Sequence, residues 1–272
     1  MLSTRHQNGK SCMLDYIGSN TGKSVLKALS EVNNFTVRQS GILVAPQASQ
    51  TYTFQFTTNI PCPGTPTILY QGQVYNTIQI FSQCWLKENL NVGTMINSTQ
   101  NQTNNSVIEK YCYDDNPDSC TKYGGLYHWD EMMQYTTQQG NQGICPPGWH
   151  IPTDEEWKVL EGAADGHYGI GSPEWDDSGY RGYDAGTNLK TTSGWYQNGN
   201  GTDLFGFSGM PGGRLIDIQG FLYLGFSGFW WTSKESGIQG AWSHNLDRLH
   251  PEVERGEISK YVYFSVRCLR DY

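Results

Sequence analysis

The strongest constraint on the fold is a complete set of helix-start signals in the middle of the chain. The Thr153 hydroxyl can accept a hydrogen bond from the Glu156 amide, and the Glu156 carboxylate can reach back to the Thr153 amide, which makes a capping box. Pro152 keeps the helix from starting earlier. The residues that follow repeat at helical spacing on one apolar face: Trp157, Leu160 and Ala164. The sequence therefore predicts an amphipathic helix from Thr153 to Asp165, with Trp157 as its anchor in the core.

Few other stretches show helical periodicity, whereas Gly, Asn, Thr, Ser and Tyr are abundant, so short strands joined by turns are expected to dominate. The expected hairpin strands are residues 68–70, 73–75, 77–81 and 84–86. Residues 97–106 are almost all Asn, Gln, Thr and Ser, which predicts an exposed loop. Residues 126–135 are expected to form a second short helix, in which His128 packs or caps rather than binds metal.

A stiff, turn-rich segment from Pro61 to Pro66 marks a boundary between two parts of the chain. Before it, residues 13–17, 35–44 and 51–57 have the character of strands, and residues 24–32 that of a short helix. We therefore expect residues 1–60 to form a β-rich lead-in segment or part of an immunoglobulin-like module. Residues 61–272 are long enough to form a second domain with a full core.

The charge and hydropathy of the chain argue against two classes of partner. The net charge is -8 and no cluster of Lys and Arg is present, so no nucleic-acid partner is expected, because neutralising phosphates takes a basic face. No apolar run reaches about 18 residues, so no membrane insertion is expected. The first residues lack the apolar core of a signal peptide. This predicts either a fragment of a longer exported protein or another route out of the cell, such as a phage particle.

Seven cysteines favour an oxidising compartment. The candidate pairs are Cys112 with Cys120, Cys145 with Cys268, and Cys62 with Cys84. The first pair flanks a turn-forming loop that a local disulfide would close, and the second would join the start of the main helix to the end of the domain. Cys12 is left over from these pairs. Because sequence alone does not determine connectivity, all three pairings are hypotheses.

The run from Trp149 to Trp157, which contains the helix start, resembles the signature of the Fibrobacter succinogenes major paralogous domain family. Five more blocks resemble that family in the same order: Gln83 to Asn91, Tyr123 to Trp129, Phe205 to Arg214, Phe229 to Ser233, and Phe264 to Cys268. The helix start and the Val-Arg-Cys ending are also similar to formylglycine-generating enzymes. The resemblance implies the α+β class and, for residues 61–272, a C-type-lectin-like fold of short antiparallel strands, one or two helices and long loops.

In C-type-lectin-like folds, the loops and strands before the last strand commonly make the ligand surface. The resemblance therefore implies an exposed binding surface within residues 234–263. Its candidate residues are Trp242, His244, Asp247, Arg248, His250, Glu252, Arg255, Lys260, Tyr261 and Tyr263. This mixture suits recognition, because aromatic rings supply contact area and charges supply direction. The expected function is an extracellular, cell-surface or virion-borne adhesin or receptor-binding domain for a surface glycan or protein.

Other functions stay open. Some relatives resemble targets of diversity-generating retroelements, although the Glu and Lys residues at 252, 254, 257 and 260 are not types that this mechanism usually produces. The formylglycine relatives imply an oxidase with two nearby cysteines, but Cys268 is the only cysteine after Cys145. We therefore expect no enzyme activity. A structural element of a surface or phage-tail assembly is the remaining alternative.

Two turn regions, residues 174–180 and 183–188, are rich in Gly and Asp. Carboxylates and amides on turns can supply oxygen ligands for calcium. Many C-type-lectin-like domains hold calcium in such loops. The expectation is no cofactor, with calcium as the open alternative.

Overall fold

The computed structural model describes residues 60–217 and 219–271, and four strands closer to the N-terminus. The chain divides into two compact units, Met1–Ile60 and Pro61–Tyr272. Each unit is described by itself. What kind of domain each unit represents stays a prediction.

The first unit contains one antiparallel sheet in the order β1-β2-β4-β3. Its strands are β1 Ser3–Gln7, β2 Ser11–Asp15, β3 Arg38–Gln39 and β4 Thr51–Gln55. Strands β2, β3 and β4 overlap the three segments that were expected to be extended, whereas β1 was not predicted. The expected helix over residues 24–32 lies outside the described residues.

The larger sheet of the second unit has the order β10-β18-β13-β15-β16-β17-β12, with β14 paired to β13. Its strands are β10 Tyr127–His128, β12 Gly179–Arg181, β13 Gly212–Ile216, β14 Gly220–Leu224, β15 Ser227–Glu235, β16 Gly240–Asp247, β17 Val253–Ser259 and β18 Val262–Phe264. Neighbours are antiparallel except β13 and β15, which run parallel through Gly213 and Gly228.

The second sheet confirms the predicted hairpins. It has the order β11-β19-β7-β6-β5. Its strands are β5 Thr67–Tyr70, β6 Gln73–Ile80, β7 Gln83–Leu86, β11 Trp149–His150 and β19 Leu269–Arg270. A separate parallel pair joins β8 Thr94–Met95 to β9 Glu109–Lys110. Because β19 pairs with both β7 and β11, the end of the domain is tied to its beginning.

The predicted helix is α4, Asp154–Ala164, and its capping box is formed as expected between Thr153 and Glu156. The other helical elements are η1 Tyr113–Asp115, α2 Pro117–Tyr123, α3 Trp129–Met132, η2 Pro173–Asp176 and α5 Ala185–Leu189. Helix α3 is shorter than the predicted 126–135, because Tyr127 first pairs with Phe264 as a strand residue. His128 caps α3 by accepting a hydrogen bond from the Asp130 amide, as predicted.

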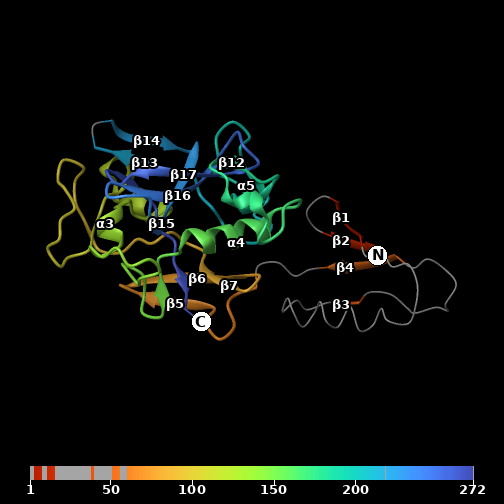
Figure 1. Cartoon of the computed structure of the whole chain (residues 1–272). Helices are drawn as coiled ribbons and strands as arrows, with labels where there is room; N and C mark the ends of the chain where they lie inside the picture. Colours follow the sequence, from red (N-terminus) through yellow and green to blue (C-terminus); the bar gives the residue numbers. More distant parts are fainter. Residues whose placement is uncertain are drawn as a thin grey trace. The chain divides into compact units, whose positions relative to one another are not determined.

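Helix α4 lies between the two sheets of the second unit (Figure 1). Its Trp157 ring packs against the rings of Trp85, Phe207 and Trp230, so the helix contacts residues of both sheets at one point. Leu160 and Ala164 are buried in the same cluster. The apolar face predicted for this helix is therefore its core face.

All three predicted cysteine pairs are disulfides in the structure: Cys62–Cys84, Cys112–Cys120 and Cys145–Cys268. The polar stretch 97–106 is a mostly exposed loop with no regular element, also as predicted. In its described part the chain combines many strands with few helices, which agrees with the α+β class. No helix in the described ranges is long and apolar enough to span a membrane.

Candidate functional site

Strand β16 separates two different environments, because successive side chains of a strand point to opposite faces of its sheet. The register of the sheet places His244 beside Trp230 of β15 and Arg255 of β17. The next residue, Asn245, lies beside Phe229 and Glu254 on the other face. The His244 face packs onto α4, and the Asn245 face points away from it.

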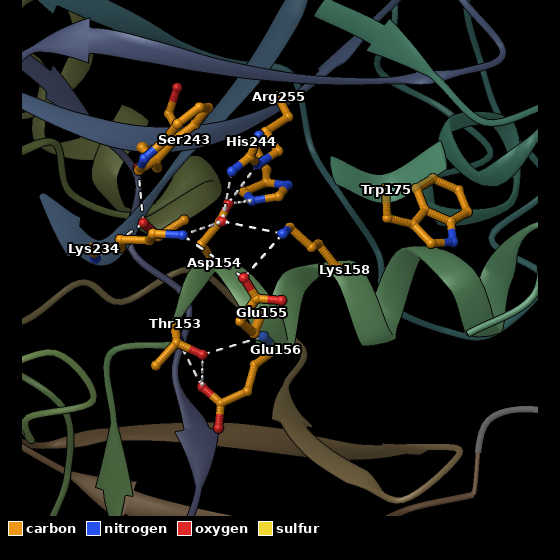
Figure 2. Close-up of polar contacts among 12 residues, drawn as sticks. Thr153, Asp154, Glu155, Glu156, Lys158, Trp175, Lys234, Ser243, His244 and Arg255 are labelled. Atoms are coloured by element: carbon orange, nitrogen blue, oxygen red, sulfur yellow. Dashed lines mark hydrogen bonds and ion pairs between the residues drawn. The ribbon is translucent and has the colours of Figure 1, made fainter. Parts of the chain in front are cut away.

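The face toward α4 is organised around the carboxylate of Asp154, which is completely buried in the first turn of the helix (Figure 2). Arg255 donates hydrogen bonds from Nε to Oδ1 and from Nη2 to Oδ2, each of 2.7 Å. His244 Nε2 lies 3.2 Å from Oδ1, and Lys234 Nζ donates to Oδ2 over 3.1 Å. Two parallel bonds from a guanidinium are the strongest form of such a pair.

His244 extends this network to a second buried carboxylate. Its Nδ1 contacts Glu161, which lies on the same face of α4 as Asp154, two turns later. Arg181 of β12 donates to the other Glu161 oxygen. The His244 ring stacks on Trp157, with centroids 5.2 Å apart and planes at 11°. Each ring nitrogen therefore faces a carboxylate, and the histidine links Asp154 to Glu161.

The pKa of Asp154 reflects this surrounding. Burial by itself would raise the pKa, but hydrogen bonds from Arg255 and His244 and their charges lower it far below its ordinary value. Arg255 responds in the opposite sense: burial alone would lower its pKa, but the bond to Asp154 raises it. The two groups are therefore fixed as an ion pair that joins α4 to the sheet.

The prediction that the side chains of His244 and Arg255 are exposed is wrong. Their side chains are 1% and 5% exposed, because both contact the buried carboxylates of α4. Lys260 is also buried, with its Nζ 3.9 Å from the centroid of the Trp129 ring and paired with Glu235. Tyr263 is buried edge-on against Tyr111. Its pKa is raised, and burial is the largest cause.

The other six predicted residues keep some exposure, and their role in binding stays a prediction. Trp242 covers the Arg255 guanidinium, whose central carbon lies 3.5 Å from the ring centroid. Arg248 lies over Phe226 in the same way. His250 stacks on Tyr180 with centroids 3.6 Å apart and lies 3.5 Å from Glu252. Tyr261 is the most exposed of the set, at 57%.

The opposite face of the sheet carries a groove with a volume of about 280 Å³. It crosses β15, β16 and β17, and residues from β12, β13 and β14 complete its walls. The polar and aromatic residues among its lining are Tyr180, Arg214, Tyr223, Ser227, Phe229, Ser243, Asn245, Asp247, Glu254, Glu257 and Phe264. Asp247 is the only predicted site residue that lines this groove.

Two buried polar atoms of the groove have no hydrogen-bond partner among the described residues. One is Oδ1 of Asn245, whose side-chain nitrogen donates to Glu254 over 3.2 Å. The other is Nε of Arg214, whose guanidinium packs over the rings of Tyr223 and Phe229 at 5.0 and 4.9 Å. Because burying an unpaired polar group costs free energy, such atoms mark places where a bound group can supply the missing bond.

Tyr180 and Tyr223 form exposed aromatic edges of the groove, at 43% and 47% exposure. Burial raises the pKa of Tyr180, and the nearby charges of Glu254, Asp247 and Glu252 raise it further, to about 12. Tyr180 is therefore a neutral phenol that can donate a hydrogen bond at ordinary pH. The groove combines aromatic surface, unpaired amide and guanidinium atoms, and carboxylates.

A family model described as the Fibrobacter succinogenes major domain matches residues 78–270. The chain belongs to this family. No curated protein and no solved structure matches the chain. The matched range contains α4, the buried network and every residue that lines the groove, and it leaves out the unit Met1–Ile60. Both candidate faces are therefore parts of the Fibrobacter succinogenes major domain itself.

Two carboxylates at or beside the turn region 183–188, one of the two regions considered for calcium, fix the backbone there. Asp165 accepts hydrogen bonds from the amides of Tyr183, Asp184 and Ala185, and Asp184 accepts one from Gly166. No group of three or more His, Cys, Asp or Glu side chains is placed to hold a metal ion in the described part of the chain. These carboxylates thus have a structural role in shaping the loops of the family domain.

The sequence did not identify the groove, although a signal was present. In residues 242–247 the polar residues Ser243, Asn245 and Asp247 alternate with Trp242, His244 and Leu246. The surface expected from the resemblance took Trp242, His244 and Asp247 from this strand, although residues 242 and 244 share one face and residue 247 lies on the other. The structure places His244 against α4, and Ser243, Asn245 and Asp247 at the groove.

Proposed function

We propose that this protein is an extracellular ligand-binding domain whose outward groove binds a glycan. The observation that carries the proposal is the pair of unpaired buried atoms, Asn245 Oδ1 and Arg214 Nε, in a groove edged by two exposed tyrosines. A sugar ring offers hydroxyl groups that both donate and accept hydrogen bonds, so it can satisfy the amide oxygen and the guanidinium nitrogen together. Its C–H faces can lie against aromatic rings.

The size and lining of the groove also favour binding over catalysis. At about 280 Å³ it is at the small end of ligand pockets, which suits one end of a longer glycan. In the unit Pro61–Tyr272 all six cysteines are paired in disulfides, and Cys145–Cys268 is fully buried, which leaves an oxidase of the formylglycine type no accessible thiol pair there. We therefore propose a binding protein and no enzyme.

The three disulfides support placement outside the reducing cytoplasm, on a cell surface or on a phage particle. The pairing of β19 with β7 and β11, together with the long loops, supports a C-type-lectin-like fold as the architecture. Diversification by a retroelement stays an open alternative, and the codons of residues 234–263 test it.

The proposal is tested on an array of glycans and surface proteins, probed with the full chain and three variants. Gly256→Leu fills the groove, because no atom lies within 4 Å of the position of its added Cβ. Tyr180→Ala removes one aromatic edge, and Tyr261→Ala is the matched control, an exposed tyrosine outside the groove. We expect glycan binding that Gly256→Leu abolishes, Tyr180→Ala weakens by about tenfold, and Tyr261→Ala leaves unchanged.

Each other outcome points to a different function. Binding that is lost only in Tyr261→Ala would move the site to the loop before β18, within the surface predicted from the sequence. Binding to proteins alone would replace the glycan with a protein ligand. No binding to either class would favour a structural element of a larger assembly.

A further inference from the structure

The charges around the groove indicate which glycans it accepts, an inference that rests on the proposed function. Asp247 on β16 and Glu254 on β17 are the carboxylates on its floor, and the exposed Glu257 of β17 is a third carboxylate residue of its lining. Asp247 accepts hydrogen bonds from the Ser227 hydroxyl and the Leu249 amide, each of 2.8 Å. Neither carboxylate has a Lys, Arg or His partner within 4 Å among the described residues.

Two cations lie near the groove without neutralising it. Arg214 is at the far wall, where its guanidinium packs between the rings of Tyr223 and Phe229. The buried Lys190 ammonium donates to the backbone carbonyls of Asp247 and His250, on the protein side of the floor. The negative charge of the floor therefore stays directed toward a bound ligand, and the raised pKa of Tyr180 is a second sign of it.

The carboxylate of Glu254 fixes the orientation of the Asn245 amide, and this decides which hydrogen bond the amide can still make. Its nitrogen has to face Glu254, because a carboxylate can only accept. Its oxygen is buried beside the groove and has no partner among the described residues, so a donor group of the ligand is one way to pair it. The floor therefore favours ligand groups that donate hydrogen bonds, O–H or N–H, whereas Arg214 Nε at the wall favours one ligand oxygen as an acceptor.

We infer that the groove selects neutral or amine-bearing sugars and rejects acidic ones. A hydroxyl, acetamido or ammonium group satisfies Asn245 Oδ1 and is attracted by Asp247 and Glu254. A uronate, sialate or sulfate group is repelled by the negative charge of Asp247 and Glu254. Its one favourable charged contact in the groove is with Arg214.

The test is a titration of the full chain with three soluble probes by calorimetry. The probes are a neutral oligomer of N-acetylglucosamine, its de-N-acetylated form, and an oligosaccharide that contains glucuronic acid. We expect the first two to bind, and the third to bind at least about tenfold more weakly. Added salt should reduce the difference between the charged probes.

Glu254→Gln is the decisive variant, since it keeps the size of the side chain and removes its charge. It should reduce the preference for the amine-bearing probe over the uronate probe by about tenfold. Asp118→Asn makes the same change of net charge at an exposed position on α2, and it should leave this preference unchanged. Equal or tighter binding of the uronate probe, or a preference that survives Glu254→Gln, overturns the inference while the glycan function stands. Binding of none of the three probes overturns the inference as well, and the array of glycans and proteins then decides on the function alone.

Discussion

His244 and Asn245 are consecutive residues of β16, yet one contacts the buried carboxylates of α4 and the other lines the open groove. A single strand, β16, therefore separates the charge network on one face of the sheet from the proposed ligand on the other. The network holds β16 and β17 at a constant distance from the helix through His244 and Arg255. A groove built on these strands inherits that rigidity, which favours tight binding because less freedom is lost when the ligand binds.

The first prediction concerns the centre of this network. Asp154→Asn should lower the free energy of unfolding by about 3–5 kcal/mol, because it leaves the Arg255 cation buried without compensation and breaks the hydrogen bond to His244. Asp176→Asn is the control, since Asp176 bonds Lys158 of the same region but is mostly exposed, and its stability should change little. Urea unfolding followed by tryptophan fluorescence measures both. Similar stabilities of the two variants would show that the network contributes nothing special.

How far the sequence predicts this structure depends on how local each feature is. The start of α4 was predictable because Thr153 and Glu156 are three residues apart, and the His128 cap is equally local. The Cys112–Cys120 disulfide was predictable because the two residues flank one short turn, whereas the two longer pairings were hypotheses that the structure confirms. The face of β16 was not, because the groups that bury His244 lie 83 and 90 residues earlier in the chain.

The groove was hidden for a related reason. Tyr180, Arg214 and Asn245 lie on three different strands, and only the order of the sheet brings them together. Alternation of polar and apolar residues normally reveals the core face of a strand. In β16 both faces carry polar residues, because the inner face holds a charge network, so the pattern gave no usable contrast.

The second prediction compares two disulfides of different span. Cys145 and Cys268 are separated by 123 residues, and Cys112 and Cys120 by 8. Because a longer closed loop restricts the unfolded chain more, replacing both cysteines by Ser should cost about 5 kcal/mol for the first pair and about 2.5 kcal/mol for the second. Denaturant unfolding of the two double variants gives the comparison. A larger loss for the short loop would mean that local packing outweighs chain entropy.

The third prediction is a pH dependence at His150, which lies between Asp271 and Glu156 at 2.6 and 3.1 Å. Burial alone would lower its pKa, but hydrogen bonds and charges from Glu156 and Asp271 outweigh it and raise the pKa. A raised folded-state pKa gives stability that is complete below the ordinary value of about 6.5 and is lost as pH rises through the raised value. His150→Asn should therefore cost about 1 kcal/mol near pH 6 and much less near pH 9.

The acid side of this dependence has the opposite sign. Burial would raise the pKa of Glu156, but His150 and Thr153 lower it, so its contribution is present above its ordinary value and is lost as pH falls through the lowered one. The contact is thus most stabilising between the two folded-state values. Unfolding of wild type and His150→Asn across this range is the measurement, with Asp271→Asn as a partial variant. A cost that is independent of pH would assign His150 a packing role instead.

The last prediction uses two glycines of the larger sheet, Gly228 on β15 and Gly256 on β17, to separate folding from binding. A Cβ at Gly228 would lie 2.4 Å from the Met210 carbonyl oxygen and 2.5 Å from the Trp230 ring, so Gly228→Ala should lower the free energy of unfolding by about 1–3 kcal/mol. Gly256 has open space in front of it, so Gly256→Leu should keep or slightly raise stability, because glycine inside a strand is unfavourable. Thermal unfolding of both variants and glycan binding of Gly256→Leu are the measurements. A stable Gly256→Leu that still binds its glycan would place the ligand elsewhere, because the same substitution leaves no room for it in the groove.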